Sequence, residues 1–234
     1  MAKPTWIFIC GTYRTASTCQ YLMAEDVIQE SESGVGIGYH TETKLKEWDD
    51  YDRRYVLAKV FVYLPETSEH ATRFLKEGRI RAIGTVRDPR DIVTSMMARA
   101  GSQWDFDQKV SEELPKWLAQ FTKWAQLGPG LSRIVRYEDM IPNLGREVRE
   151  IAKFLEIDLP EGMDFEIARR YTIKAQKKRA EELRGTGKRD HPYLSVIPGI
   201  VFGSAGQWQT WLSPAQAKKI EKVTEGFMKK WDYL

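Results

Sequence analysis

A run of small and hydroxyl-bearing residues around one arginine follows an apolar segment near the start of the chain. The apolar segment is TWIFIC, residues 5–10, and the run is GTYRTAST, residues 11–18. Backbone N–H groups at a helix start point outward without partners, and the helix dipole adds positive potential. Small residues let an anion approach, and the hydroxyls of Thr15, Ser17 and Thr18 can donate hydrogen bonds. These features indicate a phosphate-binding loop.

The loop departs from the G-x-x-x-x-G-K-[ST] pattern of nucleotide triphosphatases at two positions. Ala16 stands in place of the second glycine, and Ser17 stands in place of the lysine. A small-molecule kinase on the same architecture is therefore the weaker alternative. A polar strand-to-helix turn without any ligand explains this loop equally well when it is taken alone.

A second stretch, TVRDPRDIVTS, places Arg87 at the end of an expected strand and Ser95 in the helix that follows. Open parallel sheets bind their ligands at this edge. An arginine there can hold a phosphate with two N–H groups, and a hydroxyl two turns later can reach the same anion. The alternative is that Arg87 forms a surface ion pair with Asp88 or Asp91.

These stretches together resemble the sulfotransferases that use 3'-phosphoadenosine 5'-phosphosulfate. YRTAST, residues 13–18, is similar to that family's P-[KR]-[ST]-G-[ST]-T motif, and residues 87–95 match its second motif in type and spacing. RYEDM, residues 136–140, looks like its Tyr-Glu-Asp strand end, where the tyrosine touches the adenine. GSAGQW, residues 203–208, is similar to its late Gly-x-x-Gly-Asp-Trp.

The resemblance implies a P-loop-like enzyme that moves a sulfuryl group to a hydroxyl or amine of a small-molecule acceptor without a metal ion. The loop would hold the 5'-phosphate, and Arg14 would stabilise charge on the leaving phosphate oxygen. The product would be adenosine 3',5'-bisphosphate. A non-catalytic nucleotide- or polyanion-binding module is the second alternative. The implied donor-binding residues are Arg14, Thr15, Ala16, Ser17, Thr18, Arg87, Ser95 and Tyr137.

The sequence departs from that family at two parts of the donor site. Cys19 stands where many relatives carry an adenine-stacking tryptophan. Val201 and Phe202 replace an Arg-Lys pair that would contact the 3'-phosphate. Lys188 or Arg189, in a basic stretch, is a candidate replacement, although a solvated basic helix and loop explains that stretch as well.

The general base is the least determined residue. Phe61 stands where many relatives have a histidine, in the segment KVF. Other branches place a glutamate between the phosphate loop and the second strand, and HTETK falls in that interval. We therefore expect Glu42, or failing that His40, to take the acceptor proton, against the alternative of a polar surface loop. We expect His70 and His191 to be structural or exposed.

An apolar acceptor pocket or an ordinary core face explains one group of aromatic residues equally well. Its members are Trp104, Trp117, Phe121 and Trp124.

Alternating apolar and amphipathic segments predict the fold. We expect one domain over residues 1–234, an α/β three-layer sandwich with a central parallel sheet. The expected strands are 6–10, 54–64, 80–86 and 132–140. The expected helices are 17–29, 66–78, 88–100, 110–127, 143–157 and 213–231, and residues 34–48 are expected to begin as a loop.

Composition excludes several other classes of protein. The formal net charge is +3, with 36 Lys+Arg against 33 Asp+Glu, which does not indicate a nucleic-acid binder. The two cysteines match neither a disulfide framework nor a zinc pattern, so we expect reduced thiols and a cytoplasmic protein. No apolar run approaches the roughly 18 residues of a membrane span. The oligomeric state stays open.

Overall fold

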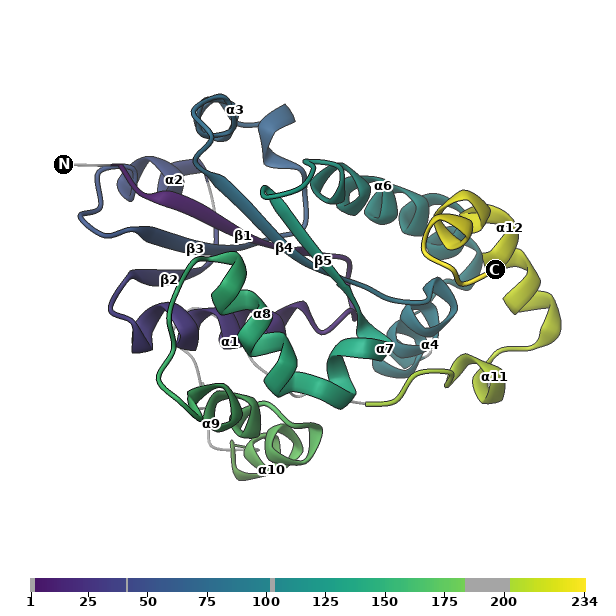
Figure 1. The fold of residues 1–234 in the computed structure, drawn as a ribbon. Coiled ribbons are helices and arrows are strands. Elements are labelled where there is room, and N and C mark those ends of the chain that lie inside the picture. Colours follow the sequence, from purple (N-terminus) through teal and green to yellow (C-terminus); the bar gives the residue numbers. More distant parts are fainter. Residues whose placement is uncertain (1–2, 41, 102–103, 184–202) are drawn as a thin grey trace.

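Five parallel strands form the centre of the protein (Figure 1), in a computed structural model that describes residues 3–40, 42–101, 104–183 and 203–234. The strand order is β2-β3-β1-β4-β5, so the first strand of the chain lies in the middle of the sheet. The strands are β1 (Thr5–Gly11), β2 (Gly34–Tyr39), β3 (Tyr55–Val60), β4 (Ile80–Val86) and β5 (Ser132–Arg136).

Helices connect the strands and cover both faces of the sheet. They are α1 (Ser17–Glu30), α2 (Glu42–Glu47), α3 (Glu69–Lys76), α4 (Pro89–Ala100), α5 (Phe106–Gln108), α6 (Leu114–Ala125), α7 (Tyr137–Met140), α8 (Leu144–Phe154), α9 (Met163–Arg170), α10 (Ile173–Leu183), α11 (Trp208–Trp211) and α12 (Pro214–Lys230). Short 3-10 turns at η1 (Leu64–Glu66) and η4 (Ile141–Asn143) and a π-helical turn at η3 (Lys109–Glu113) join them.

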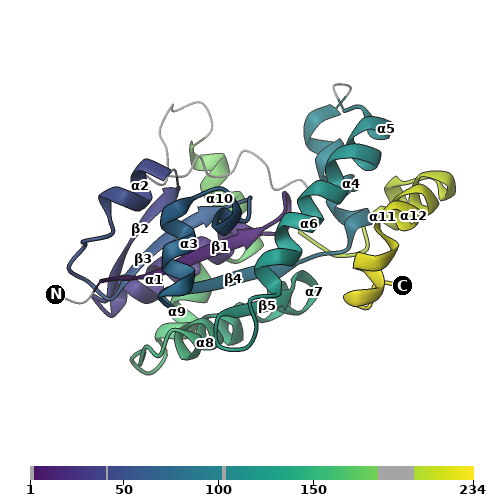
Figure 2. The ribbon, with the colours of Figure 1, turned by 90° about the horizontal axis from the view of Figure 1, so that it is seen from above.

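Alternation along β1 divides the core into two layers. Ile7 and Ile9 pack with α1, α8 and α9, whereas Trp6 and Phe8 pack with α2, α3 and α6. Seen from above, α3 and α6 lie over the strands (Figure 2). Successive side chains of a strand point to opposite faces, so a strand that is apolar throughout must be covered on both sides. This arrangement confirms the predicted three-layer α/β sandwich.

The strand β2 was not predicted, because its glycines hide it. A Cβ atom on Gly34 would lie 2.4 Å from the carbonyl oxygen of Tyr55, and one on Gly36 would lie 2.0 Å from Oε1 of Glu25. Glycine is therefore required where β2 approaches β3 and α1. The same glycines weaken the β-strand signal in the sequence, and the expectation of a loop at residues 34–39 was wrong.

The last strand is shorter than predicted. It ends at Arg136, and Tyr137–Met140 forms a helical turn instead of continuing the strand. Glu138 and Asp139 lie in the first turn of that helix, where carboxylates favour the helical state. In the described residues, no helix is both long enough and apolar enough to cross a membrane.

Candidate functional site

A cavity of about 430 Å³ lies over the carboxyl ends of β1, β3 and β4. Its volume is in the range of small-ligand sites, and it lies at the edge where parallel sheets bind ligands. Its lining residues are Tyr13, Arg14, Ala16, Ser17, Thr18, Cys19, Tyr39, Lys59, Phe61, Arg87, Ser95, Met96, Arg99, Tyr137, Ile141, Tyr171, Ile173, Gln176 and Gly203.

The loop after β1 has a strained backbone. Arg14 and Ala16 have φ values of 64° and 59°, in the left-handed region that glycine adopts most easily. Alternation of left- and right-handed residues turns successive N–H groups toward one side and makes an anion-binding concavity. The hydroxyl of Thr15 donates to the carbonyl of Thr12 at 2.9 Å and so stabilises the loop, and the Thr15 side chain does not line the cavity.

Arg14 and Ser95 meet across the cavity wall. The Nε atom of Arg14 donates to Oγ of Ser95 at 2.9 Å, although the residues lie on different elements. Burial lowers the pKa of Arg14, and the positive charges of Arg99 and Arg87 lower it further. The structure therefore brings the two sequence motifs together at one place.

Arg87 is buried in the same wall, with only 2% of the residue exposed. Its two Nη atoms donate to the carbonyls of Arg14 at 2.9 Å and Ser204 at 3.2 Å, and its guanidinium lies 4.1 Å from the ring centre of Tyr137. Its Nε atom is buried without a hydrogen-bond partner in the described residues. This orphaned donor suits an anion in the cavity.

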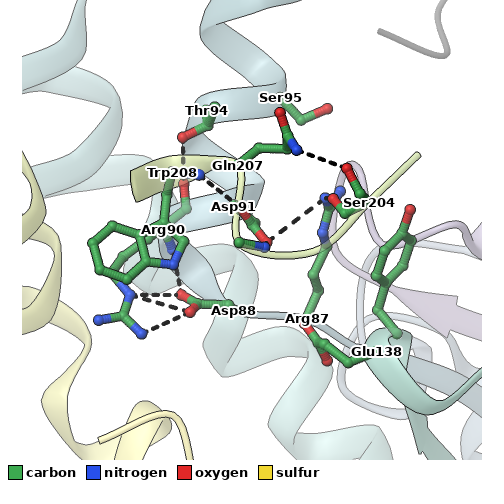
Figure 3. Close-up of polar contacts among 12 residues, drawn as sticks. Arg87, Asp88, Arg90, Asp91, Thr94, Ser95, Glu138, Ser204, Gln207 and Trp208 are labelled. Atoms are coloured by element: carbon green, nitrogen blue, oxygen red, sulfur yellow. Dashed lines mark hydrogen bonds and ion pairs between the residues drawn. The ribbon is translucent and has the colours of Figure 1, made fainter. Parts of the chain in front are cut away.

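Asp91 fixes the late motif against α4. Its buried carboxylate accepts hydrogen bonds from the backbone N–H of Gly206 at 2.7 Å and of Trp208 at 3.0 Å (Figure 3). The guanidinium of Arg90 lies 4.0 Å from the ring centre of Trp208 and pairs with Asp88. Arg87 and Asp91 form a long ion pair, with 3.9 Å between the nearest nitrogen and oxygen. Both side chains are buried, so this is not the surface ion pair that the alternative expected.

Lys59 is one of the cavity residues that sequence reasoning overlooked. It is 2% exposed on β3, and its Nζ atom donates to Oγ1 of Thr18. Burial, assisted by the charge of Arg14, lowers its pKa from 10.5 to about 7. A lysine inside the apolar run YVLAKV was the available signal, because a charge is rarely placed in a central strand without a task.

Neither candidate base lines the cavity. Glu42 is exposed at the start of α2, and its Oε1 atom lies 3.6 Å from Nε2 of His70. The ring of His40 lies against the carbonyl of Lys59 at 3.3 Å, and burial lowers its pKa. This geometry does not support either residue as the proton acceptor, because α2 begins at Glu42 and sets its carboxylate beside α3.

Aromatic rings line one side of the cavity. Tyr13 stacks on Phe61 with ring centres 4.6 Å apart, and Phe61 lies 5.7 Å from the ring of Tyr39. Trp117 contacts Tyr13 edge-on. Phe121 and Trp124 belong to the core, as the alternative proposed, and Trp104 does not line the cavity.

The charged residues that line the cavity are all positive among the described residues. Four cationic residues line the cavity, namely Arg14, Lys59, Arg87 and Arg99, and no aspartate or glutamate lines it among the described residues. The residues that the structure describes contain no cluster of histidine, cysteine and carboxylate side chains that could hold a metal ion. Such a lining suits a ligand with several negative charges.

Part of the cavity lining comes from α1, α7 and α10. Cys19 and Ile173 line it together with Tyr137, whose hydroxyl donates to the carbonyl of Gly203 at 3.2 Å. Five residues named in the sequence analysis lie outside the residues that the structure describes, namely Lys188, Arg189, His191, Val201 and Phe202.

Comparison with known proteins points in one direction. A family model described as Sulfotransferase domain matches residues 67–232. Sulfotransferase 1 family member D1 of Mus musculus is 31% identical over 96 residues, which are 41% of this chain and 32% of that protein, so the match spans about a third of the relative's length.

Solved structures share the fold at low sequence identity. Retinol dehydratase in complex with androsterone and inactive cofactor PAP has a TM-score of 0.68 at 17% identity, over 98% of this chain and 82% of that one. Mouse sulfotransferase SULT7A1 complexed with PAP has a TM-score of 0.67 at 17% identity, over 97% and 86%.

Asp91→Asn should loosen the late motif. The amide retains the shape of the carboxylate but carries no charge and only one acceptor oxygen, so one hydrogen bond weakens and the other is lost. We expect a loss of about 1.5–3 kcal/mol in the free energy of unfolding, and faster hydrogen exchange at the amides of Gly206 and Trp208. Asp107→Asn, which breaks an exposed pair with Lys219, is the matched control and should cost under about 1 kcal/mol. Unchanged exchange at both amides would show that Asp91 does not hold this segment.

Proposed function

Because this chain belongs to the sulfotransferase domain family, we propose that it transfers a sulfuryl group from 3'-phosphoadenosine 5'-phosphosulfate to a hydroxyl or amine of a small molecule. One observation carries the proposal. A phosphate loop, the orphaned Nε of Arg87 and four cations converge on one cavity whose described lining has no carboxylate. The related structures that contain PAP add support through their shared fold.

The residues present fit such a donor. The loop at Ala16, Ser17 and Thr18 would hold the 5'-phosphate, because these residues line the cavity at the start of α1. Arg87 and Ser95 would hold the 3'-phosphate, and Tyr137 would contact the adenine. The donor supplies the activated sulfuryl group.

Arg14 and Lys59 would supply the positive charge that sulfuryl transfer requires. Negative charge grows on the leaving phosphate oxygen in a loose transition state. Arg14 is a fixed cation on the loop, and Lys59 lies beside Thr18 at the end of the same loop. Cations held in place before the reaction stabilise that charge without reorganisation.

Arg14→Ala should mainly affect turnover. Removing one transition-state donor lowers kcat by about two to three powers of ten, whereas the affinity for adenosine 3',5'-bisphosphate should change much less. Steady-state sulfuryl transfer and calorimetry measure the two effects. Arg146→Ala, on the exposed face of α8, removes an equal charge away from the cavity and should have neither effect. Near-normal turnover in Arg14→Ala would exclude the proposed role.

Arg87→Ala should discriminate between two nucleotides. A hydrogen bond to a charged group contributes about 1.5–3 kcal/mol, so affinity for adenosine 3',5'-bisphosphate should fall by that amount. Affinity for adenosine 5'-phosphate should be nearly retained, since it lacks the 3'-phosphate. Calorimetry with both nucleotides tests this, and a thermal melt monitors folding. Equal losses would assign Arg87 to structure alone.

Lys59 should make nucleotide binding depend on pH. Its pKa of about 7 leaves it mostly neutral above that pH, and a bound phosphate should raise the pKa by attraction. Adenosine 3',5'-bisphosphate should therefore bind with uptake of about one proton near pH 8, and weaken by up to about tenfold per pH unit between pH 7 and 9.

Calorimetry in two buffers of different ionisation enthalpy counts that proton. Lys59→Met should abolish the uptake, which separates Lys59 from His40, the half-buried imidazole beside the Lys59 carbonyl. Proton uptake that survives in Lys59→Met would assign it to another residue.

A further inference from the structure

The cationic lining exceeds what the donor alone would occupy. In the proposed function, Arg14 and Lys59 contact the 5' side of the donor, and Arg87 contacts the 3'-phosphate. Arg99 is the fourth cation of the cavity, and it forms no ion pair or hydrogen bond in the described structure. An arginine that lines a cavity without a partner is available to a ligand.

Arg99 lies near the end of α4, one helical turn farther from the start of that helix than Ser95. It follows Ser95 by one turn of α4, because residues four apart share a helix face. Its charge is close enough to act on Arg14 and on Tyr39, whose pKa it lowers against the larger effect of burial. Tyr39 ends β2, at the opposite edge of the sheet from Tyr137 and β5.

The sheet order thus separates two halves of the cavity. The half over β4 and β5 contains Arg87 and Tyr137, where the donor would lie. The half over β2 and β3 contains Tyr39 and Phe61, with Tyr13 stacked on Phe61. Tyr13 and Tyr39 are 38% and 42% exposed and line the cavity, so their rings are accessible to a ligand.

We propose that the acceptor is an aromatic hydroxyl compound that carries an anionic group, and that Arg99 binds that group. The ring would stack against Tyr13, Tyr39 and Phe61. A carboxylate on a short chain would meet Arg99, for which a guanidinium is well suited geometrically. This inference rests on the proposed function, because it assigns the remaining half of the same cavity.

A pair of isosteric acceptors tests the proposal. The probes are 3-(4-hydroxyphenyl)propionate, which is anionic, and 3-(4-hydroxyphenyl)propionamide, which has the same shape without charge. Calorimetry measures the binding of each to the complex with adenosine 3',5'-bisphosphate, and steady-state kinetics measures kcat/KM for each. We expect the carboxylate to be favoured by about fivefold or more at low salt, with a smaller preference at high salt because ions screen the pair.

Two variants assign the preference to Arg99. Arg99→Gln should bring the ratio between the two acceptors close to one, while affinity for adenosine 3',5'-bisphosphate stays within about twofold. Arg146→Gln removes the same charge from α8 and should keep the full preference. Since Arg146 is exposed and does not line the cavity, it controls for net charge.

The failures are distinguishable. If adenosine 3',5'-bisphosphate does not bind, the proposed function fails. If it binds but the two phenols bind equally, or neither binds, the anionic-acceptor proposal is overturned and the proposed function stands. A preference that persists in Arg99→Gln would also overturn the assignment.

Discussion

A single guanidinium, that of Arg87, joins the walls of the cavity. From the end of β4 it reaches the carbonyl of Arg14, the carbonyl of Ser204 and the ring of Tyr137. Its nearest carboxylate oxygen is 3.9 Å away, so backbone dipoles and an aromatic face provide most of its stabilisation. These contacts connect three segments that are remote in the sequence, namely the loop after β1, the late motif and the turn after β5.

The residues around this guanidinium lower the stability of the folded protein. Arg14, Lys59 and Arg87 share a poorly hydrated space, and the depressed pKa of Lys59 reflects that environment. The backbone is also strained at Arg14 and Ala16, where a left-handed conformation costs roughly 1–2 kcal/mol per residue. Strain and like charge gathered at one place are typical of sites organised for a ligand before it arrives. A bound polyanion would reduce the repulsion among these cations, so binding would stabilise the folded protein.

Local pattern predicted most of the fold, and tertiary contacts decided the rest. The phosphate loop, Arg87 and Ser95 follow strands whose apolar runs are clear in the sequence. The strand β2 was hidden because Gly34 and Gly36 serve close packing. Lys59 was included in an expected strand, but its burial beside Thr18 depends on how β3 packs against the loop after β1. The positions of Arg99 and Glu42 depend on how α4 and α2 sit against the sheet, which spacing along the chain does not reveal. Sequence reasoning therefore found cavity residues that follow β1 and β4, and it missed Lys59 and Arg99.

The central position of β1 has a consequence for how the protein is made. Synthesis produces this strand first, yet its register requires Tyr55 and its neighbours on one edge and Ile80 and its neighbours on the other. Parallel pairing over such separations is slow, and an unpaired apolar strand attracts other chains until its partners emerge. Residues 203–208, which dock on Asp91, are made after all five strands of the sheet. The cavity wall that contains Gly203 is therefore completed only after the whole sheet has been made.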